Sequence, residues 1–149
     1  MRTIPSEPTQ ADIGWLAGIL DGEGSIVFSK RKRHPRIAYG INLVNTNMEL
    51  MEKANNIIAR LCKDLEGTPI KISTKAYATN PFGTTVRKQC YQITIRRQTW
   101  IVRILGILLP HLTEKRVKAS ALHELFLTHI PGQWYTEKEL EKAQWARRD

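Results

Sequence analysis

The chain has 149 residues, enough for one compact domain with its own core, and no linker long enough to separate two domains interrupts it. Its hydrophobic content of 42% is ordinary for a folded protein, and no apolar run approaches the roughly 20 residues of a membrane span, so no membrane partner is expected. Lys and Arg number 23 against 14 Asp and Glu, a net charge of +9 that favours a polyanionic partner, most often nucleic acid, over a merely basic protein without one.

The two cysteines, Cys62 and Cys90, have no metal-binding or redox spacing, which favours a reduced, intracellular environment. The first residues are polar and lack the apolar core of a secretory signal peptide. We therefore expect an intracellular protein, cytoplasmic in a prokaryote or organellar if an organelle encodes it. Nothing indicates an organic cofactor, and the four histidines, which have no ligand spacing, are expected to be structural: His34, His111, His123 and His129.

A helix is predicted from about Gln10 to Asp21, opened by a capping box of Thr9 and Asp12. Gly24 then permits a sharp exit from it. Alternating apolar residues predict a strand at 25–33 and, beyond a basic hairpin tip, a returning strand at 37–45. The side chains expected to face the core from these strands are those of Ile26, Phe28, Ile37, Tyr39, Ile41 and Leu43.

A second helix should open with a capping box of Thr46 and Glu49, because apolar residues then recur at helical spacing as far as Leu61. Two further strands are predicted at 70–77 and 85–96, on either side of a turn rich in Asn, Pro and Gly.

Helices dominate the rest of the chain. An apolar stripe predicts a helix at 100–109 that stops at Pro110, and another helix should run from Thr113 to about residue 128. A last helix, opened by a capping box of Thr136 and Glu139, should end near residue 148.

This order of elements predicts an α+β fold of the form αββαββα, with a four-stranded antiparallel sheet, helices on one face and additional C-terminal helices. The other face would carry polar and basic side chains almost free of carboxylates. Such side chains contact phosphates and base edges, so we expect this face to bind DNA rather than to be an ordinary solvated sheet face. The expected DNA-binding residues are Ser29, Arg31, Arg33, Arg36, Asn42, Lys71, Ser73, Lys75, Lys88, Gln92 and Thr94.

The first helix has glycine at positions 14, 18 and 22, every fourth residue. Each interior glycine costs about 1 kcal/mol of helix stability relative to alanine, so a compensating contact is expected. Residues four apart share one helix face, and a face without side chains allows another backbone to approach closely. That backbone could be a strand of the same chain or the same helix of a second copy. Asp21 and Glu23 follow at the C-terminal end, where the helix dipole prefers cations.

The stretch from Leu16 to Gly24 resembles the signature of the LAGLIDADG homing endonucleases. Gly22 stands where the family usually has alanine, and Glu23 replaces its second aspartate, the metal-binding acid, with a longer carboxylate. The predicted order of elements over about 10–128 is also that of the family, and the final helix lies beyond it. The positions identical to the consensus are Leu16, Ala17, Gly18, Asp21 and Gly24.

The resemblance implies a homodimer, because members with one copy of the signature pair two such helices about a two-fold axis. The expected interface residues are Gly14, Ala17, Gly18, Asp21 and Gly22. Both Glu23 carboxylates would then meet at the axis and, with the Gly22 position, bind Mg²⁺, with Ca²⁺ expected to support DNA binding without cleavage. A solvated acid or a helix-end ion pair is the alternative for Glu23, and a structural cap is the alternative for Asp21.

The resemblance implies two more residues beside the scissile phosphate. Lys115 matches the family's lysine, with Arg116 and Lys118 as rivals, and would offset phosphate charge or assist proton transfer. Asn45 occupies the position where relatives often have a glutamine that orients water. The expected catalytic residues are thus Glu23, Asp21, Lys115 and Asn45.

The function implied is site-specific double-strand DNA cleavage at a long, near-palindromic site, leaving 3′ overhangs, by a sheet that sits on the duplex as a saddle. The gene would then lie in an intron or another mobile element. Two alternatives share the fold: an RNA-binding maturase that aids intron splicing, and a DNA-binding protein that no longer cleaves.

Overall fold

The computed structural model describes residues 7–30, 35–67, 71–75 and 89–147, and all statements about structure below concern these residues. It contains a four-stranded antiparallel sheet with the strand order β1-β2-β4-β3. The elements in chain order are α1 (Gln10–Glu23), β1 (Gly24–Lys30), β2 (Ile37–Asn45), α2 (Met48–Leu61), β3 (Ser73–Lys75), β4 (Cys90–Ile95), α3 (Gln98–Leu108), the 3₁₀ helix η1 (Leu109–His111), α4 (Arg116–Thr128) and α5 (Glu137–Arg147).

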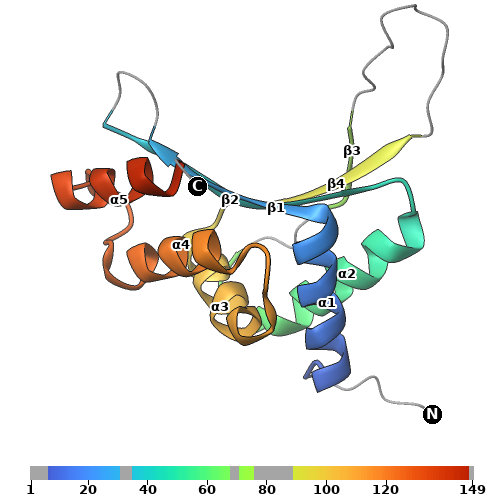
Figure 1. Cartoon of the computed structure of the whole chain (residues 1–149). Coiled ribbons are helices and arrows are strands. Elements are labelled where there is room, and N and C mark those ends of the chain that lie inside the picture. Colours follow the sequence, from blue (N-terminus) through green and yellow to red (C-terminus); the bar gives the residue numbers. More distant parts are fainter. Residues whose placement is uncertain (1–6, 31–34, 68–70, 76–88, 148–149) are drawn as a thin grey trace, which may run out of the picture.

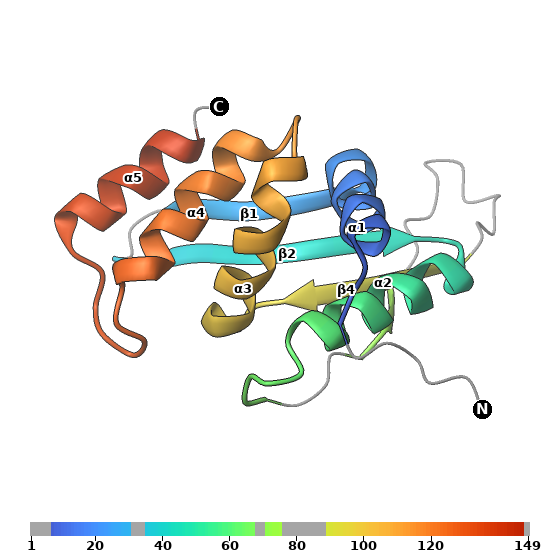
Figure 2. The ribbon, with the colours of Figure 1, turned by 90° about the horizontal axis from the view of Figure 1, so that it is seen from below.

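The helices that the structure describes lie on one side of the sheet, and the opposite side is uncovered and concave (Figure 1). Seen from the helical side, α4, α3 and α1 cross the strands, α2 runs beside β4, and α5 lies at the edge formed by β1 (Figure 2). The predicted α+β order of elements and the single antiparallel sheet are therefore confirmed.

The core lies between the sheet and the helices, and its buried residues form one cluster. The strands contribute inward side chains such as Phe28, Ile41 and Ile93, while α1 contributes Leu16 and Leu20, all at most 2% exposed. The inward residues alternate with outward ones along each strand, as the pleat requires. Among the described helices, none is long and apolar enough to cross a membrane.

Helix boundaries differ from the prediction at several places. Helix α1 continues to Glu23, two residues beyond the predicted end, so this acid belongs to the last helical turn. Helix α2 is capped by Asn47, whose side chain accepts from the amide of Leu50, and the predicted Thr46 box is wrong. Helix α4 begins at Arg116 rather than Thr113. The Thr9–Asp12 and Thr136–Glu139 capping boxes are confirmed.

The third and fourth strands are shorter than predicted over the residues described. Strand β3 begins at Ser73, and strand β4 begins at Cys90 and ends at Ile95. Residues 68–70 and 76–88, which carry the remaining predicted strand positions, lie outside the described part of the chain.

Gly24 has an extended backbone with φ of −91°, not the left-handed conformation that a glycine exit usually provides. A glycine is needed here because there is no room for a side chain. A Cβ would lie 2.6 Å from Leu20 Cδ1, 2.9 Å from the Leu20 carbonyl oxygen and 2.9 Å from Leu43 Cδ2. The missing side chain lets the end of α1 turn directly into β1 against β2.

Candidate functional site

The C-terminal end of α1 gathers the four residues predicted to be catalytic. Glu23 is exposed in the last helical turn, and Asn45, the last residue of β2, donates from Nδ2 to Glu23 Oε2. The Asn45 Oδ1 atom accepts from the amide of Asn47 at 2.7 Å, which fixes the orientation of the Asn45 side chain. The antiparallel register pairs Gly24 with Leu43, so the end of α1 and the end of β2 must meet here.

Asp21 binds the segment that precedes α4. Its carboxylate accepts from the amides of Thr113 at 2.7 Å and Lys115 at 3.0 Å. No side chain of the segment itself caps α4, so an acid from α1 provides acceptors there instead. Asp21 is half-buried and both of its oxygens are engaged, which supports the structural role considered for it.

Lys115 is also half-buried, and its Nζ donates to the main-chain oxygen of Asp21. An ammonium group at the C-terminal carbonyls of α1 complements the negative end of the helix dipole, and α1 has no basic residue of its own in its last turn. The rivals Arg116 and Lys118 lie in the first turn of α4, exposed and half-buried respectively. Lys115 is therefore placed at the same helix end as Glu23 and Asn45.

The glycine face of α1 is open. A Cβ added at Gly14, Gly18 or Gly22 would meet no atom within 4 Å, so no other described segment of the chain packs on this face. Ala17 is fully buried in the core, and its side chain does not lie on the open face. The open face is thus narrower than the predicted interface, because it does not include the Ala17 side chain. Among the described residues, no strand of the same chain packs on these glycines, so that alternative is excluded for them.

The described residues contain no cluster of three or more His, Cys, Asp or Glu side chains that could hold a metal ion. One protomer therefore offers the exposed Glu23 carboxylate and little else. Mg²⁺ binds through one or two protein carboxylates, and water and phosphate oxygens complete its coordination. A single carboxylate per protomer therefore fits Mg²⁺ at a site shared by two protomers and a bound phosphate. It fits poorly a metal held by one chain alone.

The strands of the sheet carry several of the predicted DNA-binding residues in rows set by the strand register. Asn42 lies between Ser25 and Thr94, and Gln92 lies between Val44 and Ser73. No residue of the four strands is an Asp or Glu. The concave face therefore presents neutral polar side chains without the carboxylates that would repel a phosphate backbone.

The polar side chains on this face differ in their hydrogen bonding. The Asn42 Oδ1 atom is buried without a hydrogen-bond partner among the described residues. Gln92 Nε2 donates to Thr94 Oγ1 at 3.0 Å, and Ser73 Oγ donates to the Gln92 carbonyl oxygen at 3.3 Å. Ser29 is half-buried, whereas Arg36 and Lys71 are exposed.

Four of the predicted DNA-binding residues cannot be placed in this way. Arg31, Arg33 and Lys88 lie outside the described residues, and Lys75 pairs with Cys90 at the end of β3 but its side chain is not described. His34 is likewise outside the described part of the chain.

Of the histidines expected to be structural, His129 is the clearest case. It is buried, its Nδ1 lies 2.8 Å from Glu139 Oε2, and its ring stacks on Tyr135. Burial lowers the pKa of His123, whose Nε2 would lie 3.1 Å from a Cβ at Gly106. His111 is exposed in η1.

Neither a protein-family model nor a curated protein sequence matches the chain. Solved structures do match it. The group I intron-encoded homing endonuclease I-CeuI, complexed with DNA, is 14% identical and has a TM-score of 0.57 over 85% of this chain and 57% of its own. The LAGLIDADG meganuclease I-AabMI, bound to uncleaved DNA, is 14% identical, with a TM-score of 0.58 over 88% of this chain and 42% of its own.

An archaeal intron-encoded homing endonuclease, I-Vdi141I, complexed with DNA, is 12% identical and has a TM-score of 0.56 over 93% of this chain and 98% of its own. The chain thus spans about half of I-CeuI and of I-AabMI but nearly the whole of I-Vdi141I. At these identities the likeness establishes the fold: the chain has the fold of the LAGLIDADG homing endonucleases, as the signature in α1 indicated.

Proposed function

We propose that this protein is a homodimeric, divalent-metal-dependent endonuclease that cuts both strands of DNA at a long, near-palindromic site. The observation that carries the proposal is the open glycine face of α1, which leads directly to the exposed carboxylate of Glu23. Two such faces can approach closely about a two-fold axis, and the approach brings one Glu23 from each protomer to the same place.

The DNA would lie on the concave face of the sheet. Three observations support this. The strands contain no acidic residue, the chain has a net charge of +9, and the side of the sheet that the helices leave uncovered is concave (Figure 1). The fold neighbours described above are bound to DNA, which supports DNA as the partner here. In a symmetric dimer two such faces read two half-sites, and a near-palindromic target follows from the symmetry.

Hydrolysis requires a water placed for in-line attack and charge stabilisation at the phosphate. The carboxylate of Glu23, with the backbone at Gly22, would hold Mg²⁺, which supplies water activation and stabilisation of the leaving 3′ oxygen. Asn45 holds the Glu23 carboxylate in place and can orient water through the same side chain. Lys115 adds positive charge beside the phosphate, and Asp21 positions Lys115 through its amide.

One carboxylate from each protomer corresponds to one cut in each strand, and the resemblance implies ends with short 3′ overhangs and a gene carried by an intron. The protein would act inside the cell, where its target DNA lies. A non-cleaving DNA-binding protein is the second candidate, because both Asp21 oxygens are engaged by amides and only the exposed Glu23 carboxylate is left to hold a metal at this helix end.

The test separates binding from cleavage. Duplexes bound in Ca²⁺ are selected from a randomised library, and their cleavage is then measured in Mg²⁺ for the wild type and for Glu23→Gln. We expect unchanged binding and a cleavage rate lowered at least about a hundredfold, since a metal ligand contributes several kcal/mol of transition-state stabilisation. Glu52→Gln, at an exposed position of α2, should cut at the wild-type rate. Undiminished cutting by Glu23→Gln removes Glu23 from the mechanism, and a wild type that binds without cutting supports the second candidate.

A further inference from the structure

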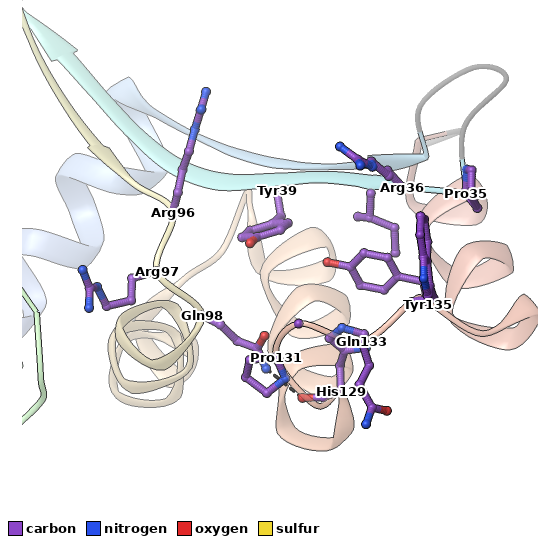
Figure 3. A pocket seen from close by; sticks show the side chains of 13 residues that line it. Pro35, Arg36, Tyr39, Arg96, Arg97, Gln98, His129, Pro131, Gln133 and Tyr135 are labelled. Carbon is purple, nitrogen blue, oxygen red and sulfur yellow. Dashed lines mark hydrogen bonds between the residues drawn. The ribbon is translucent and has the colours of Figure 1, made fainter.

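A second feature lies at one end of the sheet, away from the end of α1. A hollow of about 500 Å³ opens between the start of β2, the link from β4 to α3, and the link from α4 to α5 (Figure 3). Its volume falls in the range of small-molecule sites, about 300–1,000 Å³. We call it the edge pocket, and the side chains used below are those of Arg36, Tyr39, Arg96, His129, Trp134 and Tyr135.

Aromatic rings form one side of the edge pocket. The Tyr135 ring stacks on the buried His129 ring, with centroids 4.2 Å apart, and Tyr39 packs edge-on against Phe126. The Glu139 carboxylate, 2.8 Å from His129 Nδ1, fixes the orientation of the His129 ring in this stack. Trp134 lines the same pocket yet is 72% exposed, the most exposed of the large apolar side chains described. A planar ring entering the pocket would cover this surface.

The other side is basic. Arg36 and Arg96 line the pocket, both are exposed, and neither has an ion-pair partner among the described residues. Arg97 also lines the pocket, but its guanidinium already donates a hydrogen bond to the Glu66 carbonyl oxygen. No Asp or Glu lines the pocket. Positive charge without acids favours an anion that the arginines would bind.

The edge pocket is continuous with the concave face. Strand β4 ends at Ile95, opposite Ile41, so the edge of β2 from Ile37 to Gly40 has no strand neighbour on that side among the described residues. A second hollow of about 240 Å³ on the sheet shares Ile37, Tyr39 and Arg96 with the edge pocket and also includes Asn42. In Figure 3 the Arg96 side chain extends past β2 to its upper side, away from Tyr39 and His129.

We propose that the edge pocket binds one unpaired nucleotide, with its base stacked on the aromatic side and its phosphate held by Arg36 and Arg96. The ligand class is a base that carries a 5′-phosphate, and the strand would reach the pocket over the open edge of β2. The proposal rests on the proposed function in one respect, that the concave face binds nucleic acid. A peptide would find the same open edge but would leave two arginines unpaired unless it were acidic.

The test uses the full chain without metal. Fluorescence anisotropy measures binding of a labelled single-stranded octathymidylate, unlabelled dTMP serves as a competitor, and a duplex selected in Ca²⁺ is measured in parallel. Trp134→Ala should weaken octathymidylate binding about five- to tenfold, since base–aromatic stacking is lost, and Trp134→Phe should recover part of it. Leu127→Ser, at an exposed position outside the pocket, should bind as the wild type does. Trp134 lies in an exposed link, so the Ala variant should fold.

Tighter binding of the octamer than of dTMP assigns the pocket to a nucleic acid strand, and equal binding assigns it to free nucleotide; both support a base with a phosphate as its ligand. Absence of octamer and dTMP binding, or binding indifferent to Trp134→Ala, overturns the proposal even when the duplex still binds. Displacement of the octamer by an acidic peptide but not by dTMP also overturns it. If the wild type binds the octamer but does not bind the duplex, the result counts against the proposed function alone.

Discussion

At the scale of single residues, the glycines near the end of α1 serve opposite purposes. Gly14, Gly18 and Gly22 have open space where a side chain would lie, whereas Gly24 has three atoms closer than 3 Å to its missing Cβ. Two of those atoms belong to Leu20 and one to Leu43, so Gly24 sets how closely the helix end approaches β2. Glu23 and Asn45 contact each other across this approach.

Gly24→Ala should therefore destabilise the protein, although alanine accepts the extended backbone of this position. We expect a loss of about 1–3 kcal/mol in the free energy of unfolding, the range for overpacking a tight site, measured by urea denaturation. Ser25→Ala, at the next and exposed position, should stay within about 0.5 kcal/mol of the wild type. Equal stability of Gly24→Ala and wild type would show that α1 and β2 can separate without cost.

The capping residues show how far local sequence predicts structure. Thr9 and Asp12 form the box that their spacing predicts, because each satisfies the amide of the other. Thr46 and Glu49 have the same spacing, but Asn47 is an equally good cap one residue later and its side chain accepts from Leu50. A spacing rule cannot rank two competing caps, because the approach of the chain from β2 decides between them.

At the scale of elements, a polar cluster holds the start of α5, in addition to the packing of Leu140 and Ala143 against the core. Glu139 accepts from the Thr136 amide at 2.8 Å and pairs with His129 at 2.8 Å, beneath Tyr135. Burial raises the pKa of Tyr135 to about 12. For Glu139, burial is the largest influence and acts upward, but the hydrogen bonds from Thr136 and His129 together lower the pKa below 4.5.

A carboxyl group with a lowered pKa stabilises the fold above its ordinary pKa, and that contribution is lost as the pH falls through the lower, folded value. Glu139→Gln should therefore lose about 1–2 kcal/mol of unfolding free energy at pH 7, and the difference from the wild type should shrink below about pH 4. Urea denaturation at several pH values measures this. Glu141→Gln, exposed on the same helix, should show no such dependence. A difference independent of pH would contradict the stabilisation assigned to the Glu139 carboxylate.

The start of α4 illustrates what the sequence could not show. Thr113 is a good cap by its residue type, yet its amide donates to Asp21, 92 residues earlier, and the helix begins only at Arg116. Among the described residues, strand β3 begins at Ser73 and not at residue 71, because its pairing with β4 starts there. Both outcomes depend on contacts between distant segments, which local periodicity does not encode.

At the scale of the whole molecule, the residues of the candidate site could be proposed from the sequence, but the hydrogen bonds among them could not. The signature in α1 and the order of the elements identified Glu23, Asn45 and Lys115, and the fold places all three at one helix end. That Asp21 would use both oxygens on amides required the tertiary structure. The edge pocket was missed because its walls come from the start of β2, the link from β4 to α3 and the link from α4 to α5, and the exposed Trp134 beside Tyr135 was its only local signal.

The open face of α1 gives the most direct prediction about quaternary structure, that two copies of the protein pair through it. Gly18 lies at its centre, and a larger side chain there meets nothing within the protomer, so Gly18→Leu should fold with unchanged helix content. In a dimer built on this face the leucine would hold the two backbones apart. We expect sedimentation to show the wild type at twice the 17.1 kDa chain mass and Gly18→Leu as a monomer.

Ser120→Leu, which adds the same side chain to an exposed position of α4, controls for a general effect of surface leucine and should remain dimeric. The dissociated Gly18→Leu protein should also fail to cut both strands of a selected duplex, because a single protomer supplies a single Glu23. A Gly18→Leu protein that stays dimeric would place the interface elsewhere and would separate the two Glu23 side chains. In that arrangement the exposed carboxylate at the end of α1 would be only a solvated acid, and the metal site would have to be sought among other residues.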